Sequence, residues 1–308
     1  MPFDGTPVLV TGCSTGLGLE TAMYLGARGF QVFATVRKPG DEDIVQVAAR
    51  DHGARVKVVQ LDLTRAHSIA SAIHDIVDQA GGLYGLINNA GIALRGCVED
   101  LTDAELRLLF ETNVIGTFGV TRAVLPYMRR ARRGRIVTIS SVGGRIATFG
   151  LSAYCASKFA LEGFGEALAL EVESFGIRSV LIEPGIVHTS RWDINRGNAV
   201  GALDPRSAYA EIFRRHEAVA DAAVERSRTR PSDVARAVHR ALTVPNPALR
   251  YVMGRPANLA ILLRRYLPNA LFERVYFGGL MRQVLGGVVS SNAQVNSGGG
   301  ASLRSGTG

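Results

Sequence analysis

The chain is poor in cysteine, lysine and tryptophan. Its three cysteines, Cys13, Cys97 and Cys155, are an odd and sparse set among 308 residues, which argues against a disulfide framework. Cysteine and histidine also lack the spacing of a metal site, so no metal is expected. We therefore expect reduced thiols and a cytoplasmic location.

Long apolar runs and basic blocks are absent as well. No stretch of about 20 uncharged apolar residues occurs, so no membrane-spanning helix is expected, and the N-terminus does not resemble a secretory signal. The net charge of +8 comes from scattered arginine, without the basic blocks and interleaved aromatics that favour nucleic-acid binding. A content of 47% hydrophobic and 20% charged residues is typical of a soluble globular protein.

Lysine is scarce enough to make one pair of residues stand out. The chain has only Lys38, Lys57 and Lys158 among 35 basic residues, and Lys158 follows Tyr154 by four positions, on one face of a predicted helix. A phenol has a pKa near 10, and an ammonium one turn away favours the phenolate and lowers that pKa. The pair therefore predicts acid–base chemistry, with Ser141 at a strand end to hold a substrate oxygen. A buried tyrosine beside a surface-reaching lysine is the alternative.

A glycine-rich turn opens the chain. An apolar strand pattern at 7–11 leads into a turn and a helical pattern at about 17–28, and a second strand pattern follows at 31–36. Glycines between a strand and a helix let the backbone approach a pyrophosphate at the helix N-terminus. The residues expected to contact that group are Gly12, Ser14, Thr15, Gly16, Leu17 and Gly18.

Strand and helix patterns alternate along most of the chain. Further strands are predicted at 56–61, 83–87, 135–140, 177–182 and 250–253, and further helices at 42–52, 65–80, 101–112, 113–130, 154–175 and 231–242. This alternation predicts an α/β fold, a doubly wound Rossmann-type parallel sheet of about seven strands with helices on both faces. Ligands then bind outside the carboxyl ends of the strands, where Gly12, Asp62, Asn88, Ser141 and Pro184 all fall.

The end of the second strand indicates which dinucleotide is bound. An acidic residue there would hydrogen-bond a ribose 2′-hydroxyl, whereas a cation suits a 2′-phosphate. The chain has Arg37 and Lys38 at this position and no acid. We therefore predict NADP, with NAD less favoured; two ordinary surface charges are the alternative.

These motifs together resemble the short-chain dehydrogenase/reductase family over residues 5 to 255. The matching residues are Thr11-Gly12-x-x-x-Gly16-x-Gly18, Asn88-Asn89-Ala90-Gly91, Asn113, Ser141, Tyr154-x-x-x-Lys158 and Pro184-Gly185. The resemblance implies that Tyr154 is the general acid/base and that Lys158 lowers its pKa and binds the nicotinamide ribose. It also implies that Ser141 polarises the substrate and that Asn113 anchors a water in the proton relay.

The resemblance also implies the remaining cofactor contacts. Asp62 and Leu63 would flank the adenine. Asn89, Ala90 and Gly91 would line the cleft, with Asn89 also suited to bracing a strand. Around the nicotinamide the implied residues are Pro184, Gly185, Ile186 and Thr189. His188, beside this loop, is more simply a loop histidine than a second catalytic group.

The chain continues beyond the predicted catalytic domain of residues 1–255. Residues 256–285 form amphipathic helical patterns that end before a Gly/Ser-rich tail, 286–308, which we expect to be disordered. The helical patterns cover the core or a pocket, or lie as a peripheral contact on a membrane surface. This extension and the residues Ala34 to Arg37 look most like the hydroxysteroid and retinol dehydrogenase branch. That likeness implies a bulky apolar alcohol or ketone as the substrate.

Three functions remain to be compared. The favoured one is an NADP(H)-dependent oxidoreductase that passes a hydride between nicotinamide and a bulky apolar alcohol or ketone. A carbonyl or 3-oxoacyl reductase of smaller polar ketones is the runner-up, and a non-catalytic cofactor-binding scaffold is the third. The resemblance also implies a homodimer or homotetramer, formed through the helices at about 113–130 and 154–175.

Overall fold

Seven strands form one sheet in which every neighbouring pair is parallel. The computed structural model describes residues 3–188 and 197–285. The strands are β1 (Pro7–Val10), β2 (Gln31–Val36), β3 (Val56–Gln60), β4 (Gly85–Asn88), β5 (Gly134–Ile139), β6 (Ile177–Pro184) and β7 (Arg250–Met253). Their order, β3-β2-β1-β4-β5-β6-β7, confirms the predicted doubly wound sheet. The strand order runs outward from β1 to β3 on one side and from β4 to β7 on the other. Sheets of this kind bind ligands where the order changes direction, between β1 and β4.

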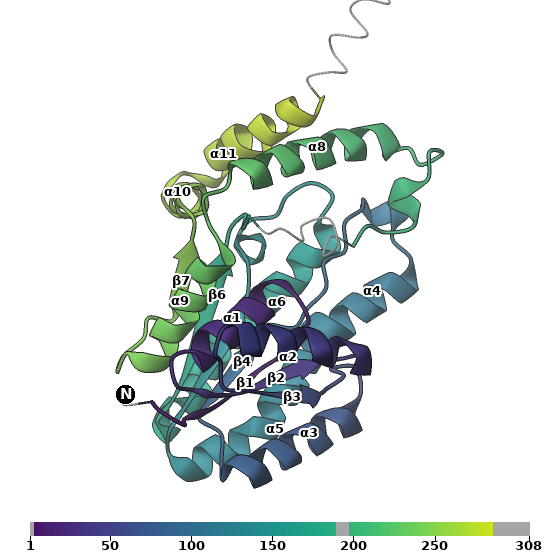
Figure 1. Ribbon diagram of the computed structural model, residues 1–308. Helices are drawn as coiled ribbons and strands as arrows, with labels where there is room; N and C mark the ends of the chain where they lie inside the picture. The colour runs from purple at the N-terminus through teal and green to yellow at the C-terminus, as the bar shows by residue number, and fades with distance from the viewer. Residues whose placement is uncertain (1–2, 189–196, 286–308) are drawn as a thin grey trace, which may run out of the picture.

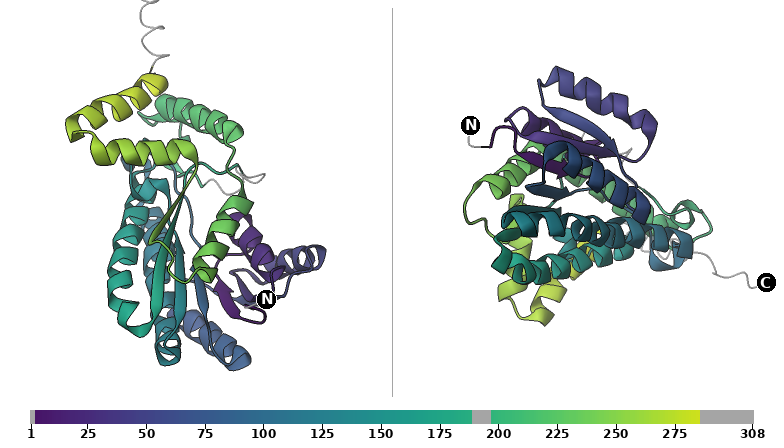
Figure 2. Two further views of the ribbon diagram at one scale, coloured as in Figure 1. Left: turned by 90° about the vertical axis from the view of Figure 1, so that its left-hand side faces the viewer. Right: turned by 90° about the horizontal axis from the view of Figure 1, so that it is seen from below.

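Helices cover both faces of the sheet (Figure 1). The helices α1 (Gly16–Gly26), α2 (Glu42–Asp51) and α9 (Pro231–Thr243) bury apolar residues against one face. The helices α3 (Ala66–Ala80), α5 (Gly116–Ala131) and α6 (Ser152–Val172) do so against the other. Figure 2 shows α1 and α9 on one side of the strands, and α5 and α6 on the other. Because both faces are covered, the strands are nearly continuous apolar runs.

Local chemistry sets several helix ends. The helix α4 (Asp103–Phe110) begins with a capping box, in which Thr102 and Glu105 satisfy each other's backbone amides. Gly81, with a φ of 69°, ends α3 in a left-handed conformation. The helix α6 begins at Ser152, two residues before the predicted start, so Tyr154 lies in its first turn.

The predicted helices at 101–112 and 113–130 are joined in the structure. Between α4 and α5 the backbone forms a π-helical turn, η3 (Glu111–Ile115), without leaving the helical conformation. One-turn π-helices are frequent at functional sites because they shift the register of side chains. Here the turn carries Asn113, one of the predicted site residues.

The C-terminal helices lie at the end of the molecule that holds the carboxyl ends of the strands. The helix α10 (Arg255–Tyr266) starts two residues after β7, and α11 (Asn269–Phe272) and the π-helical η7 (Glu273–Phe277) follow, with helix continuing over 278–285. Figures 1 and 2 show α11 beside α8 (Ala210–Arg226). No helix within 3–188 and 197–285 has the length and hydrophobicity to cross a membrane. The predicted tail, 286–308, lies outside the described residues.

Candidate active site

The predicted catalytic residues meet at the carboxyl end of β5. Ser141 follows this strand by two residues, and Tyr154 and Lys158 lie one turn apart on α6. The Lys158 Nζ atom donates a hydrogen bond to the Ile139 carbonyl over 2.9 Å, and it lies 5.7 Å from the centroid of the Tyr154 ring. The strand end thus fixes the amine beside the phenol.

The protein does not lower the pKa of Tyr154, which corrects our expectation. Burial raises that pKa, and the hydrogen bond with Ser141 and the positive charge of Arg95 oppose the increase without cancelling it. Burial also lowers the pKa of Lys158 to about 8, against the opposing charge of Glu162. The amine is therefore a weaker cation than a surface lysine, and one of its protons is directed to Ile139. The acid form of the phenol is favoured, which suits a proton donor to a ketone.

Asn113 is fully engaged by its neighbours. Its side-chain amide donates to the Ile92 carbonyl at 2.9 Å and to Ser157 Oγ at 3.1 Å, and its Oδ1 atom accepts from the Ile92 amide at 2.8 Å. Ser157 in turn donates to the Tyr154 carbonyl over 2.7 Å. Asn113 therefore joins the β4 loop to the first turns of α6. Its implied role as the anchor of a relay water stays a prediction.

The glycine turn after β1 has the shape that a dinucleotide needs. Gly12 and Gly16 have φ angles of 70° and 59°, a region that L side chains rarely adopt. A Cβ atom on Gly18 would lie 2.1 Å from the Gly12 carbonyl oxygen, so only glycine lets α1 approach the turn this closely. Thr15 caps α1 without a side-chain hydrogen bond to it, and such a helix N-terminus attracts phosphate. Ser14, Thr15, Gly16 and Leu17 all remain partly exposed there.

Asn89 holds this turn against the next strand. Its side-chain amide donates to the carbonyls of Thr11 and Gly12 over 2.9 and 3.0 Å, while Thr11 Oγ1 accepts from the Asn89 and Ala90 amides over 3.0 Å each. Asn89 therefore has the structural role considered for it, because it braces the turn after β1. Ala90 and Gly91 continue along the same side of the cleft and are not buried.

The adenosine end of the cleft combines cations with one carboxylate. Arg37 and Lys38 are exposed after β2. Asp62 follows β3; burial alone would raise its pKa, but hydrogen bonds from Thr64 and the charges of Arg65 and Arg37 together lower it. Arg37 is therefore close enough to Asp62 for their charges to interact. Leu63 is only 8% exposed and packs in the core, so its side chain offers the cleft little surface.

The loop after β6 faces the C-terminal extension. The Gly185 amide donates to the Met253 carbonyl over 2.9 Å, and a Cβ atom on Gly185 would lie 2.9 Å from that of Ala257 in α10. Pro184 is buried and Ile186 is exposed. His188 Nδ1 donates to the Val224 carbonyl over 3.2 Å, which ties the loop to α8. Thr189, and Trp192 beyond it, lie outside the described residues.

Sequence patterns gave no indication of a buried ion pair next to the catalytic centre. Arg95 in the loop after β4 donates from Nε and Nη2 to the carboxylate of Glu217 in α8, over 2.5 to 3.0 Å. The two side chains are 6% and 11% exposed. The partners are 122 residues apart, so periodicity carries no trace of the contact. The charge of Arg95 reaches Tyr154.

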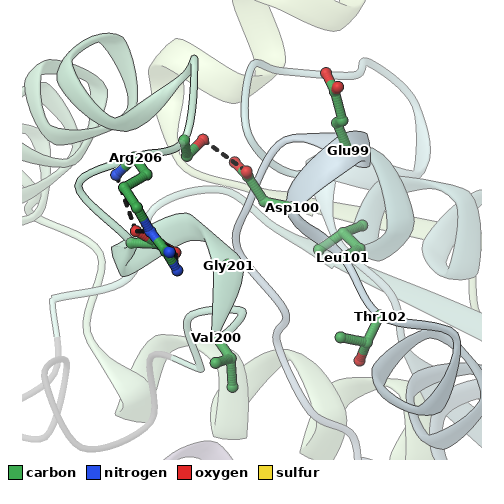
Figure 3. Close-up of a pocket in the computed structure, with 9 residues that line it drawn as sticks. Glu99, Asp100, Leu101, Thr102, Val200, Gly201 and Arg206 are labelled. Atoms are coloured by element: carbon green, nitrogen blue, oxygen red, sulfur yellow. Dashed lines mark hydrogen bonds and ion pairs between the residues drawn. The ribbon is translucent and has the colours of Figure 1, made fainter.

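A shallow hollow lies beside this loop but away from the catalytic residues. It has a volume of about 580 Å³ and is lined by residues 99–102 together with Val200, Gly201, Asp204, Arg206 and Ser207. Figure 3 shows Asp100 reaching a serine across it, and Ser207 Oγ donates to Asp100 over 2.6 Å. The hollow contains none of the predicted catalytic or cofactor residues. Its hydrogen bond joins the β4 loop to the segment before α8.

Known proteins resemble the chain along most of its length. Residues 6–198 match the family described as short chain dehydrogenase. The 3-ketodihydrosphingosine reductase of Bacteroides thetaiotaomicron is 37% identical over 247 residues, 80% of this chain and 87% of the relative. Retinol dehydrogenase 5 of Homo sapiens is 33% identical over 291 residues, 89% of each chain. A variant of actinorhodin polyketide ketoreductase solved with NADPH has a TM-score of 0.70 and 29% identity, and covers 81% of this chain and 95% of its own.

Proposed function

We propose a specific function for this chain, which belongs to the short-chain dehydrogenase/reductase family. The chain is an NADP(H)-dependent oxidoreductase of bulky apolar alcohols or ketones. Membership of the hydroxysteroid and retinol branch makes the chain an NAD(P)-dependent dehydrogenase or reductase. The observation that carries the proposal is the convergence of Ser141, Tyr154 and Lys158 at the carboxyl end of β5, two strands from the glycine turn that follows β1.

The chain's own residues handle the proton. The bound nicotinamide supplies or accepts the hydride. Tyr154, hydrogen-bonded to Ser141, gives its proton to the forming alcohol oxygen during reduction and takes it back during oxidation. The Lys158 amine is held beside the ring by Ile139, and its remaining protons would bind the nicotinamide ribose.

The preference for NADP rests on the adenosine end. Arg37 and Lys38 are exposed after β2, and Arg37 is near enough to Asp62 to lower the pKa of its carboxyl. A guanidinium binds a phosphate with two parallel hydrogen bonds. The ribose 2′-phosphate would therefore find a cation here, whereas a bare 2′-hydroxyl would find no acidic partner at positions 37 and 38.

The surroundings of Tyr154 support an apolar substrate. Ala153 packs in a small apolar cluster with Leu94, Leu109, Ala199 and Phe213, all at this end of the molecule. The C-terminal extension reaches the same end of the sheet, because Ala257 in α10 packs against Gly185 in the loop after β6. Apolar walls favour an apolar substrate over a small polar ketone.

Loss of the Tyr154 hydroxyl tests the proposal. Tyr154→Phe should reduce kcat by about 1,000-fold and leave the affinity for NADPH within about twofold, since the phenol transfers the proton and the cofactor binds along the cleft. NADPH consumption should be measured with a steroid-like ketone, a long-chain ketone and a small polar ketone. Full activity of the variant would overturn the mechanism. Turnover restricted to the small ketone would favour the runner-up, and a wild type that binds NADPH but reduces none of the three would favour the scaffold.

A basic apolar surface supports peripheral membrane contact, which we propose for the predicted extension, residues 256–285. Five arginines and one acid, Glu273, lie between residues 255 and 285. Large apolar side chains are exposed over the same helices: Leu259, Leu262, Leu263, Tyr266, Leu271 and Val275. Apolar side chains rimmed by arginine suit the interface of an anionic bilayer.

Vesicle binding separates this surface from other apolar surfaces. The wild type should sediment with phosphatidylglycerol vesicles and less with phosphatidylcholine vesicles, because the arginines favour anionic lipid. Leu262→Asp should weaken this binding at least fivefold. Leu108→Asp is the matched control, since Leu108 on α4 is about as exposed as Leu262 and lies outside both the extension and the helices α5 and α6. Equal binding by the wild type and Leu262→Asp would contradict the contact.

We also propose that the chain forms a homodimer or homotetramer through α5 and α6. Apolar side chains are exposed on these helices and on the turn before them, among them Ile115, Phe118, Phe159 and Leu170. A symmetric pair of chains would bury this surface. Light scattering after size exclusion should give a multiple of the 32.9 kDa chain mass, and Phe118→Glu should reduce it.

A further inference from the structure

A group of buried charges lies on the turn of α6 that follows Lys158. Glu162 is four residues further along the helix and is only 6% exposed, as is Lys158 itself. Residues four apart on a helix are neighbours on one face. Glu183 in β6, an acid within an apolar strand, is fully buried.

One arginine nitrogen joins the two carboxylates. The Nε atom of Arg250 in β7 donates to Glu162 Oε2 at 3.0 Å and also lies 2.9 Å from Glu183 Oε1. Because both oxygens share this nitrogen, they lie within about 6 Å of each other. Arg145 Nη1 donates to the same Glu183 oxygen over 3.1 Å, and Arg250 Nη2 donates to Glu166 Oε1 over 2.5 Å.

The other oxygen of each carboxyl has no donor. Glu162 Oε1, Glu183 Oε2 and the neighbouring Ser140 Oγ are buried without a hydrogen-bond partner among the described residues. A Cβ atom on Gly144 would lie 2.9 Å from Ser140 Oγ and 3.0 Å from Glu162 Cγ, so the backbone closes tightly over this place. Two buried carboxyls at short range cannot both remain ionised at little cost, and one proton between them relieves the repulsion.

We propose that Glu162 and Glu183 are positioning residues, that Glu183 holds the one proton that relieves the repulsion between them, and that Glu162 holds the neighbouring Lys158 amine in its ammonium form. This inference rests on the proposed function, because it assigns the pair to the Tyr154–Lys158 site. Neither carboxyl touches the reacting atoms. Both act through Lys158, which needs its charge to stabilise a phenolate and its protons to bind the ribose.

The protonation equilibria of the group support this arrangement. Burial and the charge of Glu162 raise the pKa of Glu183, Arg145 and Arg250 oppose both effects, and the resulting pKa is about 7. Burial lowers the pKa of Lys158 to about 8 even though Glu162 acts against it. Without Glu162, the amine would therefore lose its proton at a still lower pH.

Charged and polar side chains surround Lys158 from every element that packs against it. On α6 these are Tyr154, Glu162 and the half-exposed Glu166; on β5 and the turn after it they are Ser140, Ser141 and Arg145; on β6 and β7 they are Glu183 and Arg250. The π-helical turn contributes the neutral Asn113 through Ser157, and Arg95 acts on the phenol. Among these, Glu162 is the charge that acts on the amine.

The scarcity of lysine makes the pKa of this amine directly measurable. With ¹³C at lysine Cε, the full chain should give three lysine NMR signals, and Lys158→Met identifies the one from position 158. Titrations should be recorded with and without NADP⁺. In Glu162→Gln the midpoint of the Lys158 signal should fall by about one pH unit. In the matched control Glu166→Gln, whose carboxyl contacts Arg250 from a more exposed position, the midpoint should not move.

Glu183 gives a different signature. The wild-type Lys158 signal should show a small inflection near pH 7, where Glu183 loses its proton, before the main step near pH 8. Glu183→Gln should remove the small inflection and leave the main step in place. If either variant fails to fold, the wild-type curve decides: a single step near the ordinary lysine pKa of 10.5 would overturn the proposal.

Turnover provides an independent readout. Glu162→Gln should keep wild-type kcat at pH 6 and lose about fivefold at pH 8, as follows from a one-unit fall in the amine pKa. A uniform loss at both pH values with an unchanged NMR midpoint would mean a purely structural role and would overturn the proposal. The NMR titration needs no substrate, so its outcome is separate from the Tyr154→Phe test of the proposed function.

Discussion

The half of the molecule that carries the cofactor cleft and the half that covers the substrate end are held together differently. In the first half, the site residues contact neighbours near in sequence or on adjacent strands, as Asn89 does with Thr11 and Gly12. In the second half, residues more than 100 positions apart meet, as Arg95 and Glu217 do. Local backbone requirements leave motifs in a sequence, whereas distant side-chain contacts do not.

The largest effect is expected when the long-range ion pair between Arg95 and Glu217 is broken. Glu217→Leu should lower the free energy of unfolding by about 3 kcal/mol, because Arg95 stays buried without this carboxylate. Chemical denaturation measures the loss. In Asp204→Asn the affected pair with Arg206 is exposed on the arginine side, so the change should be too small for denaturation to resolve. Equal effects of the two substitutions would remove the distinction between the halves.

The next largest effect is expected when Gly18, which the backbone of the cofactor half requires to be a glycine, is replaced. Gly18→Ala places a Cβ atom 2.1 Å from the Gly12 oxygen, and the displaced turn should destabilise the protein by about 2 kcal/mol and weaken NADPH binding. Gly163→Ala on α6 is the control, since nothing lies within 4 Å of its added Cβ; the better helix propensity of alanine should stabilise that variant slightly. Thermal unfolding and fluorescence titration measure both, and an unaffected Gly18→Ala variant would contradict the tight fit.

A pH-dependent effect at Lys158, the predicted catalytic lysine, sharpens the comparison. The pKa of Lys158 is about 8 when folded and 10.5 in its unperturbed state, so between these pH values the unfolded chain binds more protons. Stability therefore rises with pH across this window. From pH 8 to 9.5 the wild type should gain about 1.5 kcal/mol relative to Lys158→Met. A constant difference between the two proteins would mean that the amine is not perturbed by burial.

The smallest effect concerns cofactor choice. Arg37→Ala should weaken NADPH binding about tenfold, or about 1.4 kcal/mol, and leave NADH binding unchanged, because only NADPH carries the 2′-phosphate. Arg50→Ala, on the exposed face of α2, is a charge-matched control with no place in the predicted cleft. Equal losses for both cofactors would contradict the assignment of Arg37 to the phosphate.

The sequence allowed the fold and the position of the site to be predicted because their determinants are local. Strand and helix patterns predicted all seven strands, and the glycine spacing after the first strand and the Tyr154–Lys158 spacing predicted a site at the carboxyl ends of the strands. The pKa of Tyr154 was predicted in the wrong direction, since helical spacing reveals the lysine but not the burial of both groups. The buried charges that the fold assembles from α6, β6 and β7 were not predicted, because the predicted strand 177–182 ended before Glu183, which lies inside β6.

The packing of Ala257 against Gly185 brings the C-terminal helices into direct contact with the loop after β6. If those helices rest on lipid, the enzyme would take its substrate from within the bilayer, where the substrate diffuses in two dimensions. The relevant concentration would then be the mole fraction of alcohol or ketone among the lipids, and diluting the bilayer with inert lipid would slow turnover at constant bulk concentration. An oxidoreductase of this kind would respond to the composition of the surface on which it works.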